Sequence, residues 1–247
     1  NVGWELGVTY RKTWGDLNFT ASANISTYKN EVTSLGNGDA IYGTAYNNNT
    51  ITKTEVGQPV GYFYGYVTNG IFQNAEQVEG SAQRETAKPG DIRYKDLNGD
   101  GIIDKGKVTL DNPGDQKVIG NSTPRYRFNL QGGIGWHGFD IRAIFEGVMK
   151  RDLWTGSDVF WGFSRGIYNS NVTQYHIDNT WTYENPTAYY PRPNTDGNGR
   201  SRQVQTKYLQ NAAYIRLKDI TLSYNIPRKW LSKLKMEQIR VYVSGMN

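Results

Sequence analysis

The 247-residue sequence has no cysteine, only 3 methionines and only 2 histidines. Without cysteine, the chain can form neither a disulfide framework nor a thiolate metal site. It also lacks an apolar run of roughly 18 residues, the length that a transmembrane helix needs. Its mean hydropathy is −0.68. This low value does not exclude a membrane, because the strands of a membrane barrel alternate lumen-facing and lipid-facing residues.

The sequence also has no long block of basic residues. The formal net charge is +5, and the lysines and arginines are dispersed along the chain. Dispersed charges of this kind indicate a solvated surface and favour no nucleic-acid partner.

Glycine and aromatic residues are abundant: the chain has 28 Gly, 18 Tyr, 8 Phe and 7 Trp. This composition favours β structure with many turns. The first thirty residues alternate, with apolar side chains from Val2 to Tyr10 and again from Leu17 to Ile25 at every second position. Such alternation predicts a hairpin of two strands, each with one apolar face, joined by a tight turn near Gly15.

The same pattern recurs twice. Residues 125–136 and 139–146 predict a second hairpin with a turn at His137-Gly138. A third hairpin is predicted from Tyr214–Ile226 and Gln238–Ser244, linked by the basic segment 227–235, which has room for one helical turn.

The connections between these strands differ in length. Short ones are predicted at residues 12–16, 137–138 and 227–237, and long ones at 27–120 and 150–205. Short turns that alternate with long loops are typical of outer-membrane barrels. A soluble β-sandwich also has alternating strands, but its loops are usually short. The predicted fold class is therefore all-β, part of a large antiparallel transmembrane β-barrel with long extracellular loops.

One loop has the pattern of a cation site. The segment 96–104 places oxygen ligands at alternate positions, with Gly101 where a calcium loop turns sharply. Lys107 occupies the twelfth position, where such a loop needs a bidentate acid, and Asp111 or Asp115 could replace it. The alternative is a turn whose side chains bind only their own backbone. The predicted metal ligands, for a structural calcium, are Asp96, Asn98, Asp100, the Ile102 carbonyl and Asp104.

Aromatic residues crowd the second long connection. They could stack on a sugar or peptide, or else pack within the loop and form an interfacial girdle. The two residues predicted to contact substrate are Trp161 and Tyr168.

No catalytic residue is predicted. His137 and His176 are too isolated for a zinc site, and no phosphate-binding glycine motif or nucleophile elbow is present. The chain is therefore not expected to be an enzyme.

Seven segments of the chain, taken together and in their order along the sequence, resemble motifs of the SusC/RagA-like TonB-linked outer-membrane proteins. The combination is more specific than any one segment. The segments that carry the resemblance are Gly57–Phe72, Pro89–Gly101, Val118–Tyr126, Gly138–Ile141, Asn185–Arg192, Ala213–Tyr224 and Arg240–Gly245.

The resemblance implies that residues 1–247 are the C-terminal portion of a barrel of about 22 strands around a plug. The plug, the early strands and the last strands would lie outside this chain. It further implies TonB-dependent import of oligosaccharides or peptides in the outer membrane of a Bacteroidetes-type cell. The implied partners are a SusD-like surface lipoprotein, outer-membrane lipid, the substrate, and the TonB complex through the absent plug.

A second function of a different class is compatible with the cation loop and the strands. The chain could be a secreted, calcium-dependent adhesion or binding module. Dependence on detergent distinguishes the two, because a barrel wall with an apolar outer face does not stay soluble and monomeric without it.

Overall fold

The computed structural model describes residues 1–36, 38–46, 49–107, 112–162, 171–193, 200–231 and 236–247. The chain divides into two compact units, which we describe separately. Unit 1 comprises residues 1–30, 123–151 and 212–247, and unit 2 comprises residues 31–122 and 152–211.

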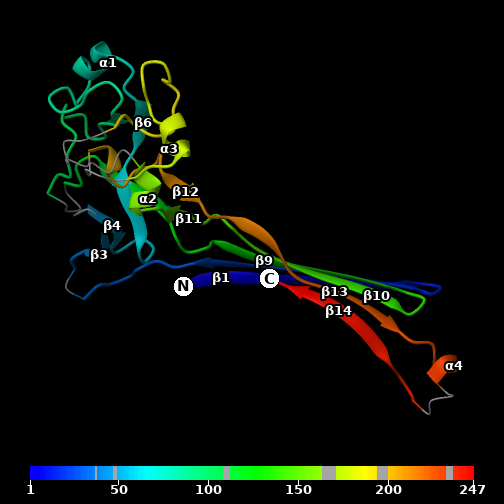
Figure 1. Ribbon diagram of the computed structural model, residues 1–247. Coiled ribbons are helices and arrows are strands. Elements are labelled where there is room, and N and C mark those ends of the chain that lie inside the picture. Colours follow the sequence, from blue (N-terminus) through cyan, green and yellow to red (C-terminus); the bar gives the residue numbers. More distant parts are fainter. Residues whose placement is uncertain (37, 47–48, 108–111, 163–170, 194–199, 232–235) are drawn as a thin grey trace. The chain divides into compact units, whose positions relative to one another are not determined.

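Unit 1 is one antiparallel sheet of six strands (Figure 1). The spatial order is β1-β2-β9-β10-β13-β14. A four-residue helix, α4 (Arg228–Leu231), lies in the link before β14. The strands are β1 (Val2–Trp14), β2 (Leu17–Lys29), β9 (Tyr126–Trp136), β10 (Phe139–Met149), β13 (Tyr214–Asn225) and β14 (Arg240–Met246).

The register puts apolar residues opposite apolar residues across this sheet. Val8 pairs with Ala23, Ala23 with Leu130, and Leu130 with Phe145. Leu130 is 40% exposed, although it lies in a central row of the sheet. This face is therefore mostly apolar and uncovered, with Lys12 as a charged exception near one end, whereas a soluble protein would bury such a face.

Aromatic residues mark both ends of the apolar face. At one end, Trp14 belongs to a row across the sheet that continues through Trp136, Phe139 and Tyr224. At the other end, ten positions earlier in β1, Trp4 shares a row with Tyr126. Ten residues span about 34 Å along a strand, or about 25 Å along the normal to a membrane at a typical barrel tilt. That is the height of the apolar band of an outer-membrane barrel.

The described residues of unit 2 form three small sheets, with strand orders β3-β4-β5-β8, β6-β7 and β11-β12. Its helices are α1 (Ala75–Glu79), α2 (Asp158–Trp161), α3 (Gln174–Asp178) and the 3-10 turn η2 (Arg200–Arg202). Its strands are β3 (Ile41–Tyr46), β4 (Asn49–Thr54), β5 (Tyr62–Tyr66), β6 (Thr68–Ile71), β7 (Ile92–Tyr94), β8 (Gln116–Asn121), β11 (Asp152–Trp154) and β12 (Leu209–Asn211).

The core of unit 2 is largely aromatic. Every residue of β5 is buried. Gln205, with no exposed surface, donates to the Ser201 carbonyl and accepts from the Thr68 hydroxyl. Such a satisfied buried amide joins distant segments without leaving an unpaired polar group.

The three predicted hairpins are confirmed. The two turns at Gly15 and His137-Gly138 have positive φ angles, 57° at Gly15 and 47° at His137. The two long connections are more ordered than loops, because together they fold into unit 2 with its own core. Among the described residues, no helix is long and apolar enough to cross a membrane.

Candidate functional site

The face of the unit 1 sheet opposite the apolar one is polar. Two neighbouring rows of this face line a cavity. In the first row, Ser26 of β2 pairs with Glu5 of β1 and Arg127 of β9. The second row contains Asn24, Asn129, Glu146 and Arg216, in register on β2, β9, β10 and β13. Period-2 alternation puts these side chains together, since their apolar neighbours point to the other face.

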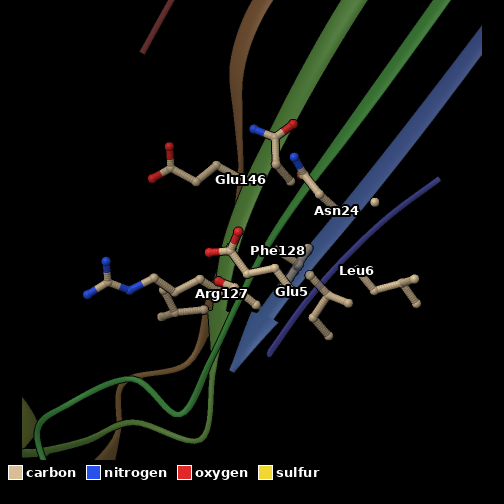
Figure 2. A pocket seen from close by; sticks show the side chains of 12 residues that line it. Glu5, Leu6, Asn24, Arg127, Phe128 and Glu146 are labelled. Atoms are coloured by element: carbon tan, nitrogen blue, oxygen red, sulfur yellow. The ribbon is translucent and has the colours of Figure 1, made fainter. Parts of the chain in front are cut away.

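A cavity of about 610 Å³ lies over these rows (Figure 2). Charged residues of both signs line it, together with the apolar residues Leu6, Ile25 and Phe128. A second cavity, of about 620 Å³, is also lined by Glu5, Ser26 and Arg127. The first row thus lies between two hollows, near the end of the sheet where β2 and β10 finish.

Glu146 and Arg216 are already paired. Arg216 Nη2 donates to Glu146 Oε1 at 2.7 Å, and the two residues are direct partners in the register of β10 and β13. Both side chains are solvent-exposed, with relative accessibilities of 43% for Arg216 and 36% for Glu146. Opposite charges facing each other across strands stabilise a sheet modestly.

A second polar cluster continues along the same face. Arg240 Nη2 donates to the Ser223 hydroxyl at 2.7 Å and lies 3.5 Å from Asp140 Oδ1. Asp140 and Arg240, together with Arg142 and Asp219, line a further cavity of about 380 Å³. The polar face therefore offers water and solutes a charged, hydrogen-bonding wall.

The Asp96 loop forms the turns expected of alternating Asp and Asn. Asp96 accepts the Gly99 and Gly101 N–H groups at 2.6 and 2.9 Å, one on each carboxylate oxygen. Asp100 accepts from the Ile102 N–H at 2.9 Å, and Asp104 from the Gly106 N–H at 2.7 Å. Among the described residues, no group of three or more His, Cys, Asp or Glu is arranged to hold a metal. Calcium binding by Asp96, Asn98, Asp100, Ile102 and Asp104 stays a prediction.

Asp115 has a different role from the one considered in the sequence. It has no exposed surface, and its two carboxylate oxygens accept the Leu97 and Asp104 N–H groups at 2.7 and 3.0 Å. The Asp115 carboxylate thereby links the start of the Asp96 loop, at Leu97, to its end, at Asp104. Asp111 lies outside the described residues.

The aromatic residues of the second long connection pack mainly on one another. Trp161 has no exposed surface, and its ring lies 4.8 Å from that of Tyr208 and 5.8 Å from that of Trp154. In the described structure, Trp161 therefore has no accessible surface with which to contact a substrate. Tyr168 lies outside the described residues.

A buried charge cluster was missed in the sequence. Lys53 Nζ lies 2.7 Å from Glu55 Oε2 and 4.5 Å from the centroid of the Tyr64 ring. The Tyr62 hydroxyl donates to the other oxygen of Glu55. Burial, with smaller effects of Tyr42 and Glu55, raises the pKa of Tyr64 to about 12. A lysine near the end of a strand and a glutamate two positions later carry no sequence signal that distinguishes a buried pair from two solvated side chains.

The fold and the two faces of unit 1 define the class of protein. An antiparallel sheet with one apolar face, aromatic residues at both ends of that face and a charged opposite face is the wall of an outer-membrane β-barrel.

Curated relatives and solved structures agree with this class. The chain is 27% identical to TonB-dependent receptor P3 of Formosa agariphila, over 100% of the chain and 24% of the relative. It is 22% identical to TonB-dependent receptor SusC of Bacteroides thetaiotaomicron, over 100% of the chain and 22% of the relative. A solved structure of the RagAB peptide transporter is similar to this chain, with a TM-score of 0.73 and 23% sequence identity. The match covers 99% of this chain and 24% of the chain in that structure.

These matches confirm the resemblance to SusC/RagA-like TonB-linked proteins and the all-β fold. They also confirm the predicted location in the outer membrane of a Bacteroidetes-type cell. The chain spans about a quarter of the length of the relatives that it matches. No family model matches the chain.

Proposed function

We propose that this chain forms part of the barrel wall and the loops of a TonB-dependent importer of oligosaccharides or peptides. Residues 1–247 would be a C-terminal portion of the barrel, and the plug and remaining strands would be supplied by the complete polypeptide. The relatives named as TonB-dependent receptors support this assignment.

The observation that carries the proposal is the contrast between the two faces of the unit 1 sheet. Leu130 and Gln131 are neighbours in β9, yet Leu130 belongs to the apolar face and Gln131 to the polar one. An apolar face with aromatic ends suits lipid, and a charged face suits a water-filled lumen. A secreted adhesion module would have to cover the apolar face, because exposed patches of this size promote association.

The proposed partners follow from the same assignment. A SusD-like surface lipoprotein would close the extracellular mouth, and the TonB complex would act on the plug from the periplasm. The relatives include SusC, and the matched structures are of the RagAB peptide transporter. The residues of this chain would supply the wall and the mouth.

Uptake by whole cells tests the proposal. A strain that lacks the gene would be complemented with the complete polypeptide, and entry of labelled peptides and oligosaccharides would be measured. We expect uptake that disappears when a protonophore collapses the energy source of TonB, while binding to the cell surface persists. Uptake that survives the protonophore, or recovery of the protein from the soluble fraction without detergent, would contradict the proposal.

A further inference from the structure

The row of Glu5, Ser26 and Arg127 has an unusual distribution of charge. Glu5 and Arg127 are exposed and lie on β1 and β9, with β2 between them. Within the described part of the chain, neither residue makes an ion pair. Neighbouring strands are about 4.8 Å apart, so the two backbones are about 10 Å apart. One carboxylate and one guanidinium thus line both cavities. Figure 2 shows the two side chains at the first cavity.

Hydrogen-bonding groups lie between these charges. Ser26 is the middle residue of the row, and Asn24 and Asn129 are direct partners in the adjacent row. An asparagine amide offers both a donor and an acceptor, as a peptide group does, and a serine hydroxyl offers both as well. The surface therefore presents an anion, then neutral polar groups, then a cation.

We propose that this row binds a short peptide as a zwitterion, with the peptide ammonium at Glu5 and the peptide carboxylate at Arg127. The inference rests on the proposed function, because it names the substrate class of the same polar wall. An extended chain advances about 3.5 Å per residue, so a tripeptide spans about 10 Å between its charged ends. That length matches the separation of the two strands.

A neutral oligosaccharide suits this row less well. It would cover Glu5 and Arg127 without supplying an opposite charge to either, and burying an unpaired charge is costly. The nearby pair of Glu146 and Arg216 does not change this balance, because each of its charges already has a partner. A ligand with two opposite ends satisfies both free charges at once, and Arg127 can bind a carboxylate through two parallel hydrogen bonds.

Calorimetry on the complete transporter in detergent tests the inference with trialanine as the probe. Two blocked forms, N-acetyl-trialanine and trialanine amide, each lack one terminal charge. We expect Glu5→Gln to weaken trialanine binding on the order of tenfold and to leave N-acetyl-trialanine unaffected. Arg127→Gln should weaken trialanine by a similar factor and leave the amide unaffected. Thr9→Val, on the same face but outside both cavities, is the control.

The outcomes separate this inference from the proposed function. Equal affinity of free and blocked peptides, or tight trialanine binding that neither substitution changes, overturns the peptide site. Maltotriose bound with the same dependence on Glu5 and Arg127 also overturns it. If trialanine does not bind while protonophore-sensitive uptake of an oligosaccharide occurs, the peptide site fails and the importer stands. If no uptake of any kind occurs, the importer itself fails.

Discussion

Arg192 and Asp91 form a buried ion pair that joins the two long connections of unit 2. Arg192 Nε lies 2.8 Å from Asp91 Oδ1, and Nη2 donates to Oδ2 at 3.3 Å. The Nε–H is not aligned for a hydrogen bond with Oδ1, so this contact is electrostatic. Nearby, Gly90 adopts a φ of 89° and leaves no space for a side chain against Trp181. The Arg192 N–H also donates to the Gly90 carbonyl at 2.9 Å, so the two segments are joined by a backbone hydrogen bond as well as by the ion pair.

Replacing Arg192 by methionine should strongly destabilise the contact between the two long connections. The Asp91 side chain is only 4% exposed, and its charge would stay buried without its partner. The Lys88 N–H would still bind Asp91 Oδ2, at 2.9 Å. We expect a loss of about 3 kcal/mol in the free energy of local opening, near the lower limit for breaking a buried pair. Native-state proteolysis in detergent measures this, because cleavage tracks the population of the opened form.

The matched control is Arg216→Met on the polar face of unit 1. Its ion pair with Glu146 is as short, 2.7 Å, but both side chains are solvent-exposed. An exposed pair contributes about 0–1 kcal/mol. Equal effects of Arg192→Met and Arg216→Met would mean that burial of Asp91 is not what makes the first pair important.

A charge on the apolar face of unit 1 should be far more costly than the same charge on the polar face. Leu130 lies near the middle of the stretch between the two aromatic rows, four residues from Tyr126 and six from Trp136, close to the expected bilayer centre. We predict that Leu130→Lys lowers the stability of the complete barrel by about 2–4 kcal/mol, measured by unfolding in lipid vesicles. Gln131→Lys, one residue further on the opposite face, should have little effect. A similar cost for both would show that the apolar face does not contact lipid.

The hairpins of unit 1 could be predicted because side chains along a strand alternate between the two faces of the sheet. Alternation from Val2 to Tyr10 fixes which side chains share a face, and the turn at Gly15 fixes the register. The polar wall followed from the same pattern. Alternation places Glu5 on the polar face of β1 and Arg127 on the polar face of β9, and the pairing of both strands with β2 brings them to the same row.

Unit 2 could not be predicted in the same way. Its contacts join segments far apart in the sequence, such as Asp91 with Arg192 and Thr68 with Gln205. No local period indicates which distant partner a residue will meet. Trp161 illustrates the difficulty, since an aromatic residue in a long connection has the same sequence pattern whether it packs in a core or faces a ligand.

Tyr64 should make unit 2 less stable at alkaline pH. Its folded-state pKa is about 12, above the ordinary value of 10.0, mainly because of burial. The unfolded chain therefore loses this proton first, and stability falls as the pH rises from 10 to 12. We expect Tyr64→Phe to make this decline shallower, as followed by the melting temperature from tryptophan fluorescence. A slope identical to that of the unchanged protein would rule out Tyr64 as a contributor.

Calcium binding to the Asp96 loop is the remaining prediction. Each oxygen of Asp96 accepts one backbone N–H and keeps a second lone pair that can face a cation. Lys107 removes the bidentate acid, so we expect weak affinity, with a Kd on the order of 10⁻⁴–10⁻³ M. Calorimetry on the complete protein should give heat that Asp100→Ala abolishes and Glu85→Ala, at an exposed acid outside the loop, preserves. If calcium gives no heat, the backbone hydrogen bonds of Asp96, Asp100 and Asp104, together with those of Asp115, are sufficient to hold the loop without a metal.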